Sequence, residues 1–142
     1  MFRAKDKSLR TRLALKMIDA CENEHIGYNI DVPARYVAYD QAVKHDGDIK
    51  AITKNGDTTC SQAISMCMRS VGIPKKYAPR HMDIVTMTKV MLNSPYFKCY
   101  KGKDYTQKSA NLEVGDILLS SHHTAMVVKT PNAQEVRGWI NN

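Results

Sequence analysis

Several features are missing from this chain of 142 residues, and each absence narrows the range of folds. No uninterrupted apolar segment approaches the roughly 20 residues that a membrane-spanning helix needs, so we expect no transmembrane segment. The segment Met1–Ala20 is basic and amphipathic and has no continuous apolar stretch, so it does not resemble a secretory signal. Internal repeats, low-complexity tracts and linkers are also missing. We therefore expect a single domain spanning residues 1–142.

Acidic side chains are scarce beside basic ones. The chain has 14 Asp and Glu against 21 Lys and Arg, which gives a net charge of +7. Such a charge attracts polyanions, either nucleic acid or the anionic polymers of a bacterial envelope. The basic residues are dispersed, and no zinc-finger or basic-helix motif occurs, so we expect no nucleic-acid partner. A non-enzymatic basic module that binds nucleic acid or envelope polymer nevertheless stays open as an alternative to an enzyme.

The four cysteines form no Cys-x-x-Cys pair; they are Cys21, Cys60, Cys67 and Cys99. His25 follows Cys21 by four residues, but no second pair of ligands follows at zinc-finger spacing, so a structural zinc site is not expected. A disulfide scaffold does not suit a chain with an ordinary apolar content of 43%. Neither a zinc site nor a disulfide framework is therefore expected to link the cysteines.

Cys60 begins a segment with helical periodicity. A polar, turn-forming run ends at this residue, and apolar side chains then recur at Ala63, Ile64, Cys67, Met68 and Val71. Gly72 ends the predicted helix, and Pro74 prevents it from restarting. Cys60 thus lies at or just before the first turn, where unpaired N–H groups and the helix dipole favour a reactive thiolate. The alternative is a small buried hydrophobic residue, the commonest environment of a free cysteine.

A pair of histidines lies between two predicted strands in the second half of the chain. Leu112–Leu119 has the pattern of a turn that enters a buried strand, and Thr124–Val128 that of a second strand. Side chains alternate along a strand, so His123 would share a face with Ala125, while His122 would point the other way. A cysteine nucleophile needs a histidine that is near in space rather than in sequence. The alternative is that both histidines are polar residues of a turn.

Helices are expected in the first part of the chain and strands in the last. The predicted helices cover Ser8–Asn23, Ala34–Lys44, the segment after Cys60 and Arg80–Leu92, with one further helical turn within Ile49–Lys54. The predicted strands cover Tyr96–Tyr100, Ile117–Ser120, Thr124–Lys129 and Gln134–Ile140, with a hairpin turn at Thr130–Asn132. Segregated helices and antiparallel strands are typical of the α+β class.

The order and spacing of these motifs resemble those of papain-like cell-wall hydrolases of the NlpC and CHAP type. The likeness is closer to the single-domain amidase or endopeptidase modules of phage lysins. The residues that carry it are Gly27-Tyr28, Arg35-Tyr36, Tyr39, the Cys60 helix, Val114–Leu119, His122–Met126 and Glu135. Many relatives have Asp directly before the cysteine, where this chain has Thr59.

The resemblance implies a papain-like fold in which N-terminal helices pack on a small C-terminal antiparallel sheet. It also implies a catalytic site of three residues: Cys60 as nucleophile, His123 as base and Glu135 as the residue that orients the imidazole. A hairpin turn at Thr130–Asn132 would bring Glu135 near His123, whereas Gln134 would point to the opposite face. Tyr28 and Arg35 are the expected substrate-binding residues, and no metal or organic cofactor is implied.

The implied reaction is cleavage of an amide bond in peptidoglycan, either by an N-acetylmuramoyl-L-alanine amidase or by a peptide endopeptidase. Such a protein would be made in the cytoplasm without a signal peptide. It would act on the bacterial cell wall, in the periplasm or outside the cell, after release or dedicated secretion. We expect a monomer. A holin or an immunity protein is a possible partner of a protein with this function.

Overall fold

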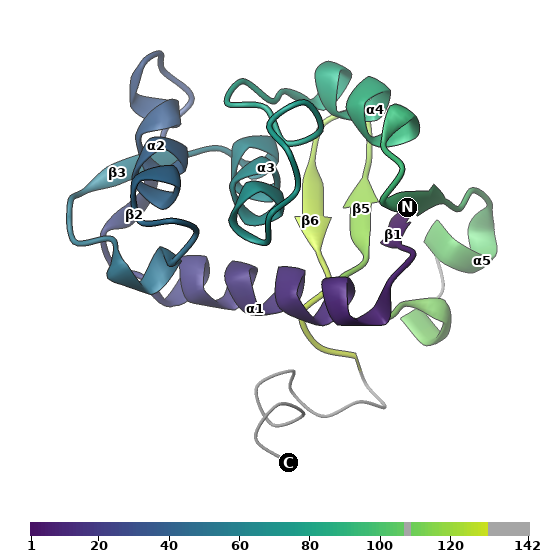
Figure 1. The fold of residues 1–142 in the computed structure, drawn as a ribbon. Helices are drawn as coiled ribbons and strands as arrows, with labels where there is room; N and C mark the ends of the chain where they lie inside the picture. Colours follow the sequence, from purple (N-terminus) through teal and green to yellow (C-terminus); the bar gives the residue numbers. More distant parts are fainter. Residues whose placement is uncertain (107–108, 131–142) are drawn as a thin grey trace.

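The computed structural model describes residues 1–106 and 109–130, which form helices around a small sheet (Figure 1). The α-helices are α1 (Lys7–Glu22), α2 (Val37–Lys44), α3 (Cys60–Ser70), α4 (Ile84–Asn93) and α5 (Lys103–Thr106), and the 3-10 turns are η1 (Ala34–Tyr36), η2 (Ile49–Ala51) and η3 (Ser109–Asn111). The strands are β1 (Phe2–Ala4), β2 (Ile26–Tyr28), β3 (Gly56–Thr58), β4 (Phe97–Cys99), β5 (Ile117–Leu119) and β6 (Thr124–Met126). This mixture fits the expected α+β class.

The main sheet has the order β4-β1-β5-β6, and every neighbouring pair is antiparallel. The sheet is therefore not built from C-terminal segments alone, as the sequence had suggested, because β1 lies between two of them. Phe2 lies opposite both Cys99 and Ile117, and it is buried together with Ala4. A strand of three residues is too short to give a clear alternating signal, which is why the sequence did not reveal it.

Strand β1 is fastened to the turn before β5 by a buried ion pair. The Arg3 guanidinium donates two hydrogen bonds to the Asp116 carboxylate, each 2.8 Å long, and Asp116 also accepts the backbone N–H of Glu113 at 2.7 Å. Asp116 is fully buried, so this pairing compensates the cost of removing its charge from water. The Val114–Leu119 motif thus has a structural role in this fold.

Two helices begin at residues that differ from the expected ones. Asp6, rather than Ser8, caps α1, because its carboxylate accepts the backbone N–H of Ser8 at 2.9 Å. Asp83 caps α4 by accepting the N–H of Thr86 at 2.7 Å, so the helix predicted from Arg80 begins at Ile84. In both cases a carboxylate at the cap satisfies an N–H group that the first turn leaves unpaired.

A second, two-stranded sheet lies at the other side of α3. Strands β2 and β3 pair in parallel, so that Tyr28 lies opposite Thr58. The sequence predicted turns or loops over both segments, because three residues carry too little periodicity to be recognised as a strand. Pairing of β2 with β3 determines the position from which the chain enters α3 at Cys60.

Helix α3 is the element around which the others are arranged. It packs against α1, α2 and β6, and α1 runs below both the helical side and the sheet in Figure 1. Ile64 and Met68 of α3 belong to the same buried cluster as Met87 of α4 and Ile117 of β5. The expected helix that begins at Cys60 is confirmed, with its end one residue before Val71.

The expected strand before the histidines and the one after them are confirmed in shorter form as β5 and β6, which pair with Leu118 opposite Ala125. The segment expected to be a loop, 104–111, contains α5 and η3 instead. Of the predicted hairpin turn at Thr130–Asn132, only Thr130 is among the described residues. The predicted strand Gln134–Ile140 lies outside them, as does Glu135.

Gly115 offers a test of how closely α1 must approach the turn before β5. Its φ is +92°, and a Cβ atom there would clash with the Arg10 backbone. Gly72 has a similar φ of +96° but open space around it. We expect Gly72→Ala to cost about 1 kcal/mol from the left-handed conformation alone. Gly115→Ala should cost at least about 1 kcal/mol more, because overpacking adds to it.

Urea unfolding of both variants measures this difference through the shift of the midpoint. Equal midpoints for the two variants would show that the contact between Gly115 and α1 is not required.

Candidate active site at the start of helix α3

The sequence places Cys60 at the entrance of the central helix, and the structure makes it the first residue of α3. Thr59 is the N-cap, and its hydroxyl oxygen accepts the N–H of Gln62 at 3.3 Å. The Cys60 side chain is half-buried, whereas Cys67, two turns further on, is fully buried. The N–H of Cys60 belongs to the first turn, where such groups have no partner within the helix. Cys60 therefore combines access with an electropositive helix end.

The first two turns of α3 are fastened to the chain at residues 79–82. The Ser61 hydroxyl donates to the carbonyl of Met82 at 2.6 Å, and the Ser65 hydroxyl donates to the carbonyl of Pro79 at 2.6 Å. The Gln62 carboxamide donates to the Arg80 carbonyl and accepts the N–H of Met82. All three α3 side chains are buried. We call this set of hydrogen bonds the α3 clamp; it holds the residues on either side of His81 against the helix that begins at Cys60.

His81 takes part in a hydrogen-bond chain with the residues around it. The Tyr36 hydroxyl lies 2.8 Å from Nδ1 of His81, and Nε2 of His81 lies 3.3 Å from the Asp83 carboxylate. Arg35 Nη2 donates to the Tyr36 oxygen at 3.2 Å. A guanidinium can only donate, so the hydroxyl hydrogen of Tyr36 stays available for Nδ1 of a neutral His81. Both ring nitrogens of His81 are thus engaged.

Two guanidinium groups lie near the Tyr36 ring. The guanidinium groups of Arg35 and Arg80 lie 5.2 and 4.5 Å from the centre of its ring, and Arg80 also makes a two-fold ion pair with Asp40. The Arg35 Nε is buried and has no hydrogen-bond partner among the described residues. The backbone N–H of Thr86, and to a smaller extent His81, hold the pKa of the Asp83 carboxyl below its usual value.

Tyr28 and Arg35, the expected substrate-binding residues, both lie on elements that contact β3, the segment that leads to Cys60. Tyr28 pairs with Thr58 across the two-stranded sheet, and its side chain is 68% exposed. Arg35 belongs to η1, which packs against β3. An exposed aromatic side chain next to a helix entrance is available to a ligand, which a core tyrosine would not be.

His123 directly precedes β6. Its backbone N–H donates to the Ser120 hydroxyl at 3.1 Å, and its carbonyl accepts the N–H of Ser120 at 2.9 Å. Strand β6 packs against α3, and Figure 1 shows that both elements start at the same end of the fold. Within the described part of the chain, no hydrogen bond joins the side chains of Cys60 and His123.

The burial pattern of β6 indicates which side of this strand faces the core. Thr124 is buried and Met126 packs against the core cluster, whereas Ala125 is exposed. Alternation continued beyond the strand would place His123 on the exposed face with Ala125, and His122 on the face of Thr124. Both histidines are exposed and lie in the turn that precedes the strand, where the chain bends between Ser120 and Thr124.

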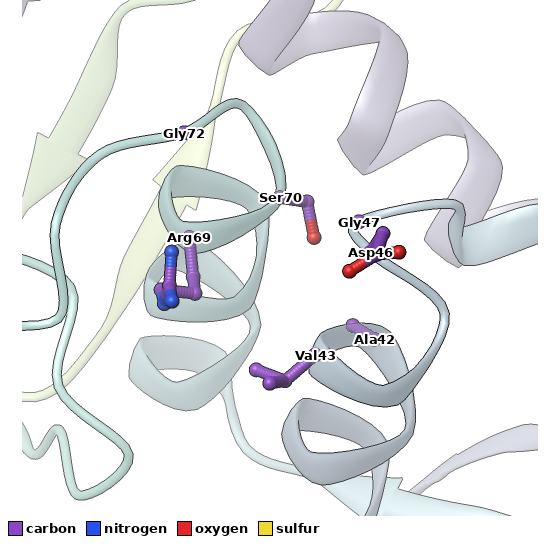
Figure 2. A pocket seen from close by; sticks show the side chains of 7 residues that line it. All are labelled: Ala42, Val43, Asp46, Gly47, Arg69, Ser70 and Gly72. Carbon is purple, nitrogen blue, oxygen red and sulfur yellow. The ribbon is translucent and has the colours of Figure 1, made fainter.

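A separate pocket lies at the opposite end of α3 (Figure 2). It has a volume of about 230 Å³ and is lined by Ala42, Val43, Asp46, Gly47, Arg69, Ser70 and Gly72. Helix α3 has 11 residues, so the two ends are about 16 Å apart. This distance separates the pocket from Cys60, and the pocket is not part of the candidate site.

His81 and Asp83 were not among the residues expected from the sequence. The pattern there had been assigned to a helix beginning at Arg80, so His81 was placed inside a regular element. A signal was present in Asp83, because Asp is one of the residues preferred at the N-cap of a helix. Recognising that cap would have left His81 in a loop, free to make contacts of its own.

Within residues 1–106 and 109–130, no three His, Cys, Asp or Glu side chains gather into a metal-binding group. No helix in the same ranges has the length and apolarity to cross a bilayer.

The fold and the site define a small α+β protein with an accessible thiol at the entrance of its central helix. The chain belongs to the endolysin-like domain family, whose model matches residues 1–134. This membership indicates a lytic function directed at the cell wall, with peptidoglycan as the substrate class. Comparison with curated proteins and with solved structures gave no match.

The reactivity of the cysteines tests the candidate site. We expect iodoacetamide at neutral pH to modify Cys60 faster than Cys21, although Cys21 is the more exposed of the two, because Cys60 lies at the electropositive start of α3. Cys67 should stay unmodified in the folded protein, since complete burial raises the pKa of its thiol well above the usual value. Peptide mass spectrometry at successive times gives the rate for each residue.

Cys21 serves as the internal reference in this experiment. If Cys60 reacts no faster than Cys21, the helix start does not activate it.

Proposed function

We propose that this protein is a papain-like cysteine hydrolase that cleaves an amide bond in peptidoglycan, as an N-acetylmuramoyl-L-alanine amidase or a peptide endopeptidase. The observation that carries the proposal is the position of Cys60, half-buried at the first residue of the central helix, in a member of the endolysin-like domain family. We further propose that residues 1–142 act as one domain, at the wall, after release or secretion from the cytoplasm.

In the proposed mechanism the thiol of Cys60 loses its proton to His123, and the thiolate attacks the carbonyl carbon of the scissile amide. The N–H of Cys60 at the helix start stabilises the negative oxygen that develops. His123 then returns its proton to the leaving amine as the C–N bond breaks, which leaves a thioester. Water, deprotonated by His123, attacks the thioester, and the acid is released with regeneration of the thiol.

His123 is preferred to His81 as the base for a physical reason. Both ring nitrogens of His81 already take part in hydrogen bonds, with Tyr36 and Asp83, so His81 could accept a proton from Cys60 only after losing one of them. The backbone of His123 is held by Ser120, while its ring is exposed at the start of the strand that packs against α3. We assign His81 a positioning role beside the helix entrance.

Tyr28 and Arg35 are proposed as substrate contacts. The exposed Tyr28 ring lies beside Thr58, two residues before the nucleophile, and its hydroxyl could hold the substrate or support the oxyanion. Arg35 is a suitable partner for a substrate carboxylate, because a planar guanidinium can bind both of its oxygens. Its position in η1, against β3, supports this assignment.

A scan of the histidines tests the proposed base. His123→Ala should lower the turnover of purified peptidoglycan at least about 1,000-fold, because the members of a catalytic triad act as a unit. His122→Ala and His81→Ala are matched controls with the same chemical change, and each should lose far less. Mass spectrometry of the released muropeptides measures the rate and also identifies the bond that is cut. Cys60→Ala supplies the inactive reference.

A larger loss in His122→Ala than in His123→Ala would transfer the role to His122, as the burial pattern of β6 permits. A Cys60→Ala protein with full activity would contradict the assignment of Cys60 as the nucleophile. A parent protein that releases no muropeptides, but binds envelope polymer with an affinity that falls steeply with salt, would favour the alternative of a basic binding module.

Glu135, which lies outside the described residues, is proposed as the group that orients His123. Glu135→Gln keeps a hydrogen-bond acceptor but removes the charge that stabilises the imidazolium, so turnover should fall, though by less than in His123→Ala. The alkylation rate of Cys60 should fall as well, because a less basic imidazole supports less thiolate. Gln134→Ala is the control. Unchanged turnover and unchanged alkylation in Glu135→Gln would remove this residue from the site.

A further inference from the structure

A groove of about 960 Å³ lies between α4 and the ends of β1, β4 and β5. Phe2, Cys99 and Leu119 contribute from the sheet, and Val85 and Leu92 from the helix. Phe2, Cys99 and Leu119 also belong to, or pack against, the main buried cluster. The groove therefore rests on the core rather than on a flexible surface segment.

The helical wall of the groove is apolar and uncovered. Val85 is 83% exposed and Leu92 is 55% exposed, and the two residues are seven apart, so they lie two turns from each other on one face of α4. Val85 is the most exposed large hydrophobic residue among those described. An apolar face next to a concave surface is typical of a binding site, because a ligand that covers the face removes its apolar area from water.

The charged residues that line the groove are all basic. Lys89 and Lys101 line it, and no acidic side chain is among its described lining residues. Near the Lys101 end, the Lys98 ammonium lies 5.1 Å from the centre of the Tyr100 ring and adds a further positive charge. Carboxylates are the groups that such a surface attracts, and a ligand with both alkyl groups and carboxylates would match the two parts of the groove.

The groove reaches the proposed catalytic turn. Ser120 and Ser121 line it, and His122 and His123 follow them directly in the chain. At the same end Ile84 lines the groove, one residue after Asp83 of the hydrogen-bond chain around His81. A ligand that extends along α4 would therefore have one end next to the residues proposed to act on it.

We propose that this groove is the subsite for the peptide stem of peptidoglycan, an extended acidic peptide. This inference rests on the proposed function, and it identifies the part of the substrate that the groove binds. Alanine methyl groups of the stem would lie against Val85 and Leu92, and its free carboxylates near Lys89 and Lys101. The glycan part is a poorer match, because sugar hydroxyls need many hydrogen-bond partners and the α4 wall offers mainly carbon.

The test uses full-length Cys60→Ala protein, which keeps the substrate intact. Two probes are titrated separately, a synthetic peptide stem with free carboxylates and a tetramer of N-acetylglucosamine, and binding is followed by amide chemical shifts in nuclear magnetic resonance. We expect the stem peptide to shift the signals of Val85, Lys89, Leu92 and Lys101, and the sugar not to do so. Val85→Asp and Lys89→Glu should each weaken binding of the stem peptide about tenfold.

Matched controls are available on α2, outside the groove. Val43→Asp repeats the first change at another exposed valine, and Lys44→Glu repeats the second change with the same shift in net charge. Both control variants should bind the stem peptide like the parent protein. Equal weakening in the Lys44→Glu control would reduce the effect to overall charge and overturn the subsite.

The outcomes separate this proposal from the proposed function. Shifts caused by the sugar alone, or groove signals that change only with protein concentration through self-association, would overturn the stem subsite. If Val85→Asp and Lys89→Glu leave the rate of peptidoglycan hydrolysis by the Cys60-containing protein unchanged, the stem subsite is also overturned. The proposed function would stand in that case. Binding of the stem peptide in the groove without any hydrolysis by the Cys60-containing protein would keep the subsite and contradict the proposed function.

Discussion

The α3 clamp is the constraint on which the site depends. Ser61, Gln62 and Ser65 are buried polar residues, and each finds its partner in the backbone of residues 79–82. A buried donor that loses its partner costs about 1–3 kcal/mol, so these side chains strongly favour one path for the loop. That path brings His81 beside the helix start, and it fixes where α4 begins.

The two ends of α3 have different roles because the chain approaches them differently. The parallel pair β2–β3 delivers the chain to Cys60 and places Tyr28 beside Thr58, so the thiol is next to an exposed aromatic side chain. At the other end, Ser70 lies against Gly47, and the small pocket there involves the ends of α2 and α3 (Figure 2). The N-terminal strand β1 completes the sheet and forms part of the apolar groove, so the start of the chain contributes to the surface next to the proposed catalytic turn.

The expectations that rested on local chemistry were the more accurate ones. A run of apolar residues ended by Gly72 and Pro74 was enough to predict α3 and to place Cys60 at its start. Expectations that rested on the order of elements were less accurate: the sheet was predicted from C-terminal strands, yet β1 pairs with both β4 and β5. His123 was inferred from the resemblance and from strand alternation, and Glu135 from a hairpin. The described residues include His123 in the turn before β6, and the catalytic roles of both residues stay predictions.

The sequence by itself determined the helix that begins at Cys60, the α+β class and a thiol at a helix entrance, since each depends on residues within a few positions of one another. Only the tertiary structure decided that Gln62 is buried against residues 80–82, that Tyr36 meets His81, and that Val85 stays exposed above a groove. Gln62 and Met82 are 20 residues apart in the sequence, and Tyr36 and His81 are 45 apart. The exposure of Val85 depends on whether a distant segment packs over it. Periodicity shows that a side chain lies on one face of a helix, but packing decides whether that face meets a neighbour or water.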